Sequence, residues 1–222
     1  VYKDGVLMAG DRRATIGNLV AQNDIEKVFP SDNESIIGIA GSAGIALELV
    51  KLFQVELEHY EKIEGTQLSV VGKANRLSVL LRGNLGLAFQ GLAAIPLFAA
   101  FDKDLNKGRV FSYDVTGGRY AEHDYYAGGS GSIFAKSSLK KMYSENLDEQ
   151  TAIRISLESL YDAAEEDSAT AGIDLTREIY PVVSIVNAEG YKRINDSKLN
   201  EIATKIFSER KNRPDGPIAR MS

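Results

Sequence analysis

Cysteine is absent from this sequence of 222 residues, and histidine occurs only twice, as His59 and His123. The lack of cysteine excludes disulfides, thiol nucleophiles and thiolate metal sites together. Two isolated histidines exclude a metal site built from several imidazoles. A chain without cysteine suits the reducing cytoplasm, so we expect a cytoplasmic protein with no metal and no cofactor.

Long apolar runs are missing as well. The longest candidate, residues 85–101, is interrupted by Gln90, Gly91 and Pro96, so no stretch reaches the roughly 20 residues that cross a bilayer. No secretory signal is visible, although a first residue other than Met indicates that the encoded chain starts elsewhere. The formal net charge of −5 argues against nucleic acid as a partner. We expect neither a membrane nor a nucleic acid among the partners.

The composition that remains is that of a globular protein, with 44% hydrophobic and 26% charged residues. We find no internal repeat and no linker, and we expect residues 1–222 to form one domain. Residues 211–222 hold two prolines, a glycine and few apolar groups, and we expect this tail to be disordered.

Apolar periodicity predicts the order of the secondary structure. Strands are expected at residues 6–9, 35–40, 92–101, 109–115, 119–126, 180–186 and 191–194, with a strand or hairpin in residues 18–30. Helices are expected at residues 43–60, 72–87, 128–143, 148–165 and 196–210, the last capped by Asp196. Pairs of helices inserted between antiparallel hairpins predict a layered α/β (α+β) sandwich with helices on both faces.

The first residues of the chain indicate a turn. Lys3-Asp4-Gly5 is a turn signal, and an apolar strand follows it at residues 6–9. Only two residues precede this turn, too few to pair with the strand that follows. We therefore expect the sequence to begin inside a strand.

Two charged residues stand beside a strand–glycine–helix turn. Asp11 ends the first apolar strand, Lys27 follows sixteen positions later, and Ile37-Gly-Ile-Ala-Gly-Ser-Ala-Gly44 leads a strand into a helix. An ion pair next to a turn with open backbone N–H groups is a plausible active-site floor, because such N–H groups stabilise an oxyanion. Without further support, an ordinary ion pair on a sheet is the stronger interpretation.

Four motifs in order make the chain resemble a known family. They are Gly10-Asp-Arg-Arg-Ala-Thr15, Gly38-Ile-Ala-Gly-Ser-Ala-Gly44, Gly129-Ser-Gly-Ser132 and Asp167-Ser-Ala-Thr170. Each is weak alone, but their order and spacing resemble the β-subunit of the 20S proteasome, of the actinobacterial type, over nearly the whole chain. The resemblance implies the fold of N-terminal-nucleophile hydrolases, a four-layer αββα sandwich of two antiparallel sheets flanked by helices.

In this family the mature chain opens with a threonine whose hydroxyl attacks the peptide carbonyl, while its own α-amine acts as base. A free α-amine has a pKa near 8, so no histidine is needed. The resemblance places that threonine six residues before Val1. Thr15 and Thr66 are internal and have no free amine. Without that threonine the chain is expected not to hydrolyse peptides, and we attribute this to missing residues before Val1 and not to the natural protein.

The resemblance also assigns roles around the missing nucleophile. Asp11 and Lys27 match the family pair, in which the lysine favours deprotonation of the threonine hydroxyl. Gly41 matches the glycine whose N–H donates to the oxyanion. Ser130 and Asp167 match residues around the terminal amine.

Thr170 matches a position of the same cluster where many relatives carry serine, a departure that keeps the hydroxyl. Taken alone, Ser130 reads as a helix N-cap and Asp167 as a solvated acid at a helix end. Arg12 and Arg13 read as structural or interface charges, and His59 as a solvated residue on a helix flank.

Substrate would bind as an added strand along the backbone of Thr15 and residues 41–43. By resemblance, the residues that line or back the first specificity pocket are Ala14, Ile25, Phe29, Ile39, Ala43 and Leu47. None is charged, which favours a hydrophobic residue before the cut. For Phe29 and Leu47, a plain core position is the competing interpretation.

The sequence thus predicts a threonine endopeptidase that degrades unfolded or tagged proteins in an enclosed chamber. The family implies a ring of seven β-subunits, flanking α-subunits, an unfolded polypeptide as substrate, and a regulatory ATPase acting through the α-ring. The absence of an N-terminal helix favours a β-subunit. An upstream Gly-Thr-Thr junction would indicate a zymogen with a cleaved propeptide. Two alternatives remain open, a catalytically silent β-like structural subunit and a hydrolase of small amides with the same fold.

Overall fold

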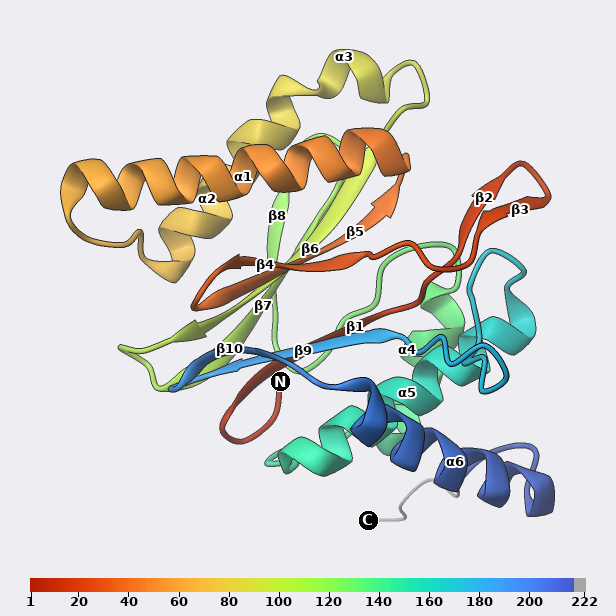
Figure 1. Ribbon diagram of the computed structural model, residues 1–222. Helices are drawn as coiled ribbons and strands as arrows, with labels where there is room; N and C mark the ends of the chain where they lie inside the picture. The colour runs from red at the N-terminus through yellow and green to blue at the C-terminus, as the bar shows by residue number, and fades with distance from the viewer. Residues whose placement is uncertain (218–222) are drawn as a thin grey trace.

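Four layers make up the molecule (Figure 1). The computed structural model describes residues 1–217. A helical layer covers a five-stranded sheet, a three-stranded sheet lies against that sheet, and a second helical layer covers the other side. This arrangement confirms the predicted sandwich of two antiparallel sheets between helices.

The larger sheet follows the chain order. Its strands are β4 (Val28–Asp32), β5 (Ser35–Gly41), β6 (Ala94–Asp102), β7 (Lys107–Tyr113) and β8 (Arg119–Glu122), each antiparallel to the next. Because β5 continues directly into a helix, its last residues lie at the edge where the sheet meets the helical layer.

The smaller sheet joins the two ends of the sequence. Its order is β1 (Gly5–Gly10), β9 (Val182–Asn187) and β10 (Gly190–Arg193), with β9 antiparallel to both neighbours. On one side β1 pairs with β9. Within the described residues, its other edge makes a single bridge, between Gly5 and Tyr2, so beyond Gly5 this edge is free to receive a further strand.

A short hairpin projects beyond the two sheets (Figure 1). It consists of β2 (Ala14–Ile16) and β3 (Leu19–Gln22), which pair with each other. Gly17 in its turn has φ of 57°, a left-handed conformation that glycine adopts at little cost. The sequence pattern placed one strand or hairpin within residues 18–30, but the chain forms this hairpin and then β4.

The helices α1 (Ala43–Glu64), α2 (Val70–Gly83) and α3 (Leu85–Ala88) cover the outer face of the larger sheet. Phe53 of α1 packs edge-to-face on Phe98 of β6, and both side chains are fully buried. The helix α1 ends at Gly65, which has φ of 66° and closes the last turn. The predicted helix at 72–87 is two helices, because the chain leaves the helical path at Asn84.

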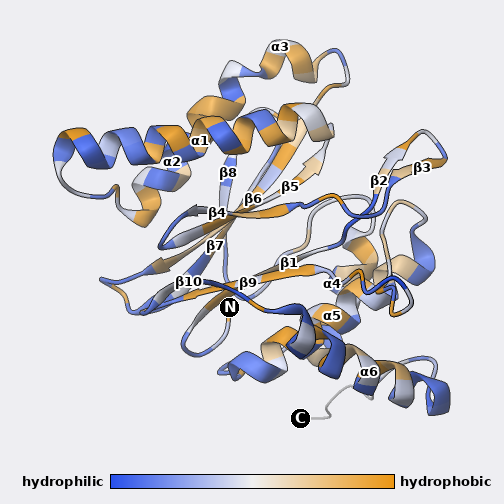
Figure 2. Cartoon of the chain, viewed as in Figure 1, coloured by the Kyte–Doolittle hydropathy of each residue, from blue (hydrophilic) through white to orange (hydrophobic). Residues whose placement is uncertain are grey.

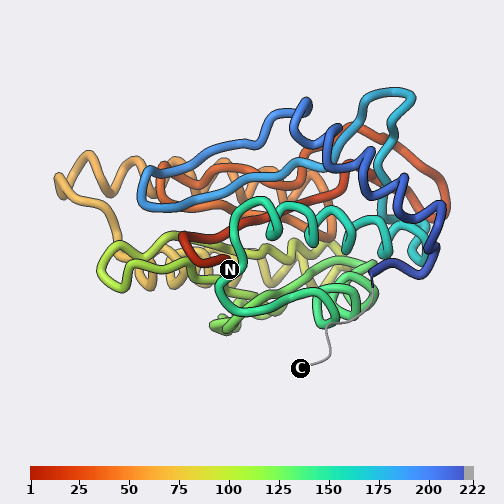
Figure 3. The backbone as a smooth tube through the Cα atoms, turned by 90° about the horizontal axis from the view of Figure 1, so that it is seen from below, coloured from red at the N-terminus to blue at the C-terminus, as the bar shows by residue number. Residues whose placement is uncertain are grey.

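The second helical layer consists of α4 (Ser132–Met142), α5 (Glu149–Glu166) and α6 (Asp196–Asn212). Seen from below, α5 lies between α4 and α6 (Figure 3). The N-cap of α6 is Asn195, whose side chain accepts a hydrogen bond from the N–H of Lys198, and not Asp196 as predicted. The tail expected to be disordered lies partly outside the described residues, and Lys211 and Asn212 within it belong to α6.

The apolar residues gather between the layers (Figure 2). One cluster joins α1 and α2 to the larger sheet, and another joins α5 and α6 to the smaller sheet. A third cluster lies between the two sheets and includes Val6, Met8, Val28 and Ile36. β1 therefore carries side chains into the layer between the sheets, which fixes the position of its end at Gly10.

Within residues 1–217, none of the helices combines the length and the apolar character that a bilayer crossing requires. The same part of the chain holds no group of three or more histidine, aspartate or glutamate side chains that could bind a metal ion.

Candidate active site

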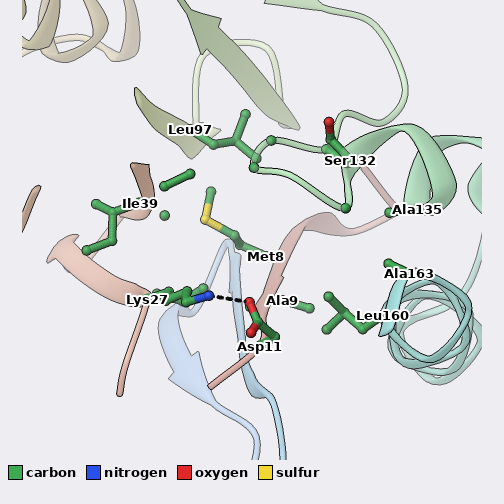
Figure 4. A pocket seen from close by; sticks show the side chains of 18 of the residues that line it. Met8, Ala9, Asp11, Lys27, Ile39, Leu97, Ser132, Ala135, Leu160 and Ala163 are labelled. Atoms are coloured by element: carbon green, nitrogen blue, oxygen red, sulfur yellow. Dashed lines mark hydrogen bonds and ion pairs between the residues drawn. The ribbon is translucent and has the colours of Figure 1, made fainter. Parts of the chain in front are cut away.

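A cavity of about 780 Å³ runs along the free edge of β1. Its lining comes from β1, the segment before β4, the end of β5, the start of α1, the loop before α4, and the facing sides of α4 and α5. Figure 4 shows Asp11 and Lys27 on one side of this cavity and Ala163 of α5 on the other. The cavity thus separates a charged pair from the helical layer.

Asp11 and Lys27 form an ion pair at the end of β1. Lys27 Nζ donates to Asp11 Oδ1 over 2.6 Å. Asp11 Oδ2 accepts hydrogen bonds of 2.9 Å from the backbone N–H groups of Arg13 and Ala171. Because three donors hold this carboxylate, the ammonium group of Lys27 is fixed in position.

Asp167 gathers two hydroxyl groups on one oxygen. The hydroxyls of Ser130 and Thr170 each donate to Asp167 Oδ2 over 2.6 Å, and the N–H of Ala169 donates to Oδ1 over 3.2 Å. Asp167 is the C-cap of α5, and Ser130 lies in the loop before α4. The prediction that Ser130 caps a helix is wrong, because Gly131 occupies the N-cap position of α4.

The pKa of Asp167 reflects two opposing effects. Burial alone raises this pKa, but the hydrogen bonds from Ser130, Thr170 and the N–H of Ala169, together with the positive charge of Lys27, bring it below the ordinary aspartate value. Asp167 is therefore ionised at neutral pH. Since the charge of Lys27 acts on this carboxylate, the ion pair and the hydroxyl pair belong to one site.

Gly41 stands where β5 turns into α1. Its φ is 94°, and a Cβ at this position would lie 2.2 Å from the carbonyl oxygen of Ala93. Both the backbone conformation and the lack of space require glycine here. Gly41 lines the cavity, as do Ser42 and Ala43 after it.

Arg13 connects the two halves of the site, a function that the sequence pattern did not reveal. Its Nη1 donates to the carbonyl oxygens of Ser168 at 2.9 Å and Thr170 at 3.3 Å, and its Nε donates to Asn23 Oδ1. The side chain thereby holds the loop after α5 against the segment that follows β1. Its position directly after Asp11 and Arg12 was the available signal, but the partners lie 155 and 157 residues away.

The residues predicted to form the specificity pocket divide into two groups. Ala14, Thr15, Ile25, Ile39 and Ala43 line the cavity together with Gly41. Phe29 and Leu47 are not among the residues that line it, and Phe29 packs against the cluster beneath α1. For Phe29, this contact agrees with the competing interpretation of a core position.

The geometry of the cavity suits a nucleophilic residue that is not part of residues 1–217. A fixed ammonium group on one side of the cavity favours ionisation of a nearby hydroxyl. Two hydroxyl oxygens that line the same cavity, both with their protons directed to Asp167, can accept hydrogen bonds from an ammonium or amine. The site is thus suited to a residue that carries both a hydroxyl and an amine.

Comparison with known proteins identifies the family of this chain. A family model described as proteasome subunit matches residues 1–176. The chain is 56% identical to the proteasome subunit beta of Streptomyces griseus over 218 residues, which cover 98% of this chain and 78% of that protein. It is 57% identical to the proteasome subunit beta of Acidothermus cellulolyticus over 222 residues, which cover 98% of this chain and 77% of that protein. The chain therefore belongs to the proteasome subunit family, as one of its β-type subunits.

Proposed function

We propose that this β-subunit acts as a threonine endopeptidase in the bacterial proteasome core, with its nucleophile carried on a strand that precedes Val1. The observation that supports this most strongly is the pair of groups described above. The Asp11–Lys27 ion pair lines one cavity together with Ser130 and Thr170, whose hydroxyls both donate to Asp167.

The pairing at the start of the chain supports the position of that nucleophile. Tyr2 pairs with Gly5 in an antiparallel bridge. Each step outward moves one residue back on the first strand and one residue forward on β1. If this register continues, the residue six positions before Val1 lies opposite Arg12, next to Asp11 and Lys27. A strand of this length extends roughly 20 Å, at about 3.3 Å per residue.

The first half of the mechanism concerns the hydroxyl group. The Lys27 ammonium lies near the threonine Oγ and stabilises the alkoxide character that develops as Oγ attacks the substrate carbonyl. Asp11 does not touch the substrate, but it holds Lys27 in position. This division makes Lys27 the electrostatic group and Asp11 a positioning residue.

The second half concerns the proton. The threonine α-amine, with an ordinary pKa near 8, accepts the proton from Oγ and later returns it to the leaving amine of the substrate. The hydroxyl oxygens of Ser130 and Thr170 accept hydrogen bonds from this group in its ammonium form. Asp167 supplies the negative charge behind them, so the protonated intermediate is stabilised.

The substrate carbonyl is oriented from the side of the larger sheet. We assign the N–H of Gly41 as the donor to the oxyanion, since Gly41 lines the cavity at the turn into α1. The backbone of Thr15 and the segment from Gly41 to Ala43 would pair with an extended peptide as an added strand. Ile25, Ile39 and the small side chain of Ala43 then favour a hydrophobic residue before the cut.

Surface side chains support assembly with other subunits. Ile16 and Leu19 on the β2–β3 hairpin are each 74% exposed, and Phe89 after α3 is 88% exposed. Large apolar groups at such exposure are covered in many proteins that assemble. We propose a ring of seven copies stacked on α-subunit rings in the cytoplasm, fed with unfolded chains by an ATPase bound to the α-ring.

The two alternatives account less well for the site. A silent structural subunit has no need for a lysine paired with a carboxylate that two backbone N–H groups also hold, nor for two hydroxyls directed to Asp167. A hydrolase of small amides has no need for a cavity of about 780 Å³ that extends along β1 from Leu7 to Gly10. The arrangement of charged and hydroxyl groups therefore favours the peptidase.

The test is to produce the chain with the six residues that the encoded sequence places before Val1, assemble it with its α-subunits, and assay hydrolysis of peptides with leucine or phenylalanine before the cut. N-terminal sequencing and intact mass establish whether the mature chain begins with threonine. Treatment with a peptide β-lactone should then add one acyl group to the N-terminal peptide.

A matched variant in which only that threonine is replaced by alanine should assemble equally and lose both hydrolysis and acylation. A mature chain without threonine at that position would overturn the proposal, and the silent subunit would replace it.

A further inference from the structure

Gly131 lies between Ser130 and the first residue of α4, and it is buried. Its φ of −77° lies on the side of the map that all L-amino acids adopt. Conformational freedom is therefore not the reason for a glycine at this position. Gly129 differs, because its φ of 96° is left-handed.

The space around Gly131 gives the reason. A Cβ at this position would lie 2.6 Å from Thr170 Oγ1, 3.2 Å from Asp167 Oδ2 and 3.2 Å from Ala163 Cβ. The first distance is well inside van der Waals contact, so the Thr170 hydroxyl would have to move. That hydroxyl is the group that donates to Asp167 over 2.6 Å.

We propose that Gly131 is a positioning residue for the hydroxyl pair. Its lack of a side chain leaves the space in which Thr170 can donate to Asp167 while Ser130 donates to the same oxygen. A methyl group there turns the Thr170 hydroxyl away from Asp167 and crowds the oxygen that both hydroxyls share. The expected effect on kcat rests on the proposed function, in which the hydroxyls of Ser130 and Thr170 contact the terminal amine. The expected displacement of the Thr170 hydroxyl does not.

Three features make the effect local. The nearest atom to the added methyl is a hydroxyl at the end of a side chain that can rotate about one bond. The neighbours at 3.2 Å need to yield by only a few tenths of an ångström. The backbone of Gly131 accepts alanine without strain, so Gly131→Ala is expected to fold and to assemble.

The test is a double-mutant cycle with Gly131→Ala, Thr170→Ala and the two together, made in the assembled subunit with its N-terminal threonine. Thr170→Ala removes the hydroxyl that the added methyl displaces. We expect each single variant to lower kcat by about 10-fold to 100-fold with little change in KM. The double variant should lose less than about threefold beyond Thr170→Ala, because nothing remains to be displaced.

Gly172→Ala is the matched control. It lies on the loop just after Thr170, and a Cβ there would make an ordinary 3.6 Å contact with Ala164 Cβ. This variant should keep the wild-type kcat and thermal midpoint. A double variant whose loss equals the product of the two single losses would overturn the proposal, because it would mean that Gly131 acts independently of Thr170.

Two further measurements separate positioning from general destabilisation. The acid limb of the kcat profile against pH should move to lower pH by the same amount in both single variants, since an ammonium group with fewer acceptors has a lower pKa. A crystal structure of Gly131→Ala should show Thr170 Oγ1 beyond hydrogen-bond distance of Asp167 Oδ2. An unchanged Thr170 rotamer would contradict the inference.

The structural measurement and a cycle of thermal midpoints need no enzymatic activity. If the wild-type assembly fails to hydrolyse peptides, the proposed function fails while the role of Gly131 is still decided. If the assembly is active and the cycle is additive, the role of Gly131 fails alone.

Discussion

Lys27 Nζ lies 2.6 Å from Asp11 Oδ1, while the other carboxylate oxygen of Asp11 accepts the backbone N–H groups of Arg13, two residues away, and of Ala171, 160 residues away. The aspartate thus ties the end of β1 to the loop that follows α5, and it presents the lysine to the cavity. Both oxygens of this buried carboxylate accept hydrogen bonds, and these bonds offset the free-energy cost of burying its charge.

Replacement of Lys27 by Met is expected to lower kcat by about 10²-fold to 10³-fold, because the electrostatic stabilisation of the nucleophile is lost. KM should change little. Steady-state kinetics of the assembled subunit measure both. Lys62→Met, which breaks an exposed ion pair with Glu58 on α1, serves as the control and should leave kcat unchanged. A Lys27→Met variant with wild-type kcat would contradict the assigned role.

Replacement of Arg13 by Ala is expected to loosen the loop after α5, because three hydrogen bonds from one guanidinium are lost. We expect a loss of about 1.5–3 kcal/mol in the free energy of unfolding, typical of hydrogen bonds to a charged group, and a fall in kcat of about 10-fold or more. Urea unfolding and peptide hydrolysis measure the two effects.

Arg13→Lys should recover only part of both losses, since one ammonium cannot reproduce the planar guanidinium fork. The control is Arg193→Ala, which removes a surface ion pair with Glu26. If Arg13→Ala and Arg193→Ala had the same free energy of unfolding and the same kcat, the hydrogen bonds of Arg13 would contribute neither to stability nor to activity.

The pKa of Asp167 predicts a dependence of stability on pH. Because its folded pKa lies below its unfolded value of about 3.9, the carboxylate contributes stability that is fully present well above pH 4. This contribution is lost as the pH falls through the folded pKa. The difference in unfolding free energy between wild type and Asp167→Asn should therefore shrink from pH 6 towards pH 3. A difference that stayed constant over this range would mean that Asp167 does not titrate as described.

The cavity wall beside Ala43 predicts a change in specificity. Ala43→Phe should fill the region where a hydrophobic side chain is expected, because Ala43 lines the cavity at the first turn of α1. We expect kcat/KM to fall about 10-fold or more for peptides with phenylalanine before the cut, and much less for peptides with alanine there. Glu48→Ala, on an exposed position of the same helix, should leave the ratio of the two substrates unchanged. An unaltered ratio in Ala43→Phe would place the pocket elsewhere.

A buried ion cluster between α5 and α6 predicts a large effect on stability. Arg210 is 6% exposed and contacts Glu158 at 3.2 Å and Asp162 at 2.6 Å, and Glu158 is 2% exposed. Arg210→Met should lower the free energy of unfolding by about 3 kcal/mol, because Asp162 loses its cation, while Glu158 keeps its ion pair with Arg154 at 3.0 Å. Denaturant unfolding measures this. A loss below about 1 kcal/mol would show that the cluster is open to solvent.

Asp162 also accepts a 2.5 Å hydrogen bond from Ser138 of α4. The cluster therefore joins all three helices of this layer, and two of them hold Asp167 and the loop of Ser130. The combined variant Arg210→Met with Asp162→Asn should be less destabilised than the sum of the single variants, since the second substitution removes the carboxylate that has lost its cation.

Much of the fold could be predicted because it depends on local patterns. The apolar repeat of Leu49, Phe53 and Leu57 places one face of α1 on the larger sheet, and all three side chains are buried. The strands β5 to β7 were expected within about two residues, since apolar runs and turn residues delimit them. Asp11 and Lys27 were expected to pair, and their charges and places at strand ends sufficed for that.

The rest depends on which distant segments the sheets bring together. Ser130 and Asp167 read separately as a helix cap and a solvated acid, and nothing between them in the sequence shows that their side chains meet. The partners of Arg13 lie 155 and 157 residues away in the sequence, and the periodicity of helices and strands does not predict contacts at such separations. The break of the second helix at Asn84 also went unpredicted, although Gly83 and Asn84 are residues that favour the end of a helix.

The sequence by itself therefore determined the layers, the helices and the charged pair, because local geometry and the burial of apolar faces act over a few residues. Only the tertiary structure decided the site. The pairing of β1 with β9 sets the end of the first strand beside the loop after α5. Hydrogen bonds from Arg13, Ala171, Ser130 and Thr170 then fix the carboxylates of Asp11 and Asp167 in one site, and their short range means that only the packed layers can bring these groups within reach.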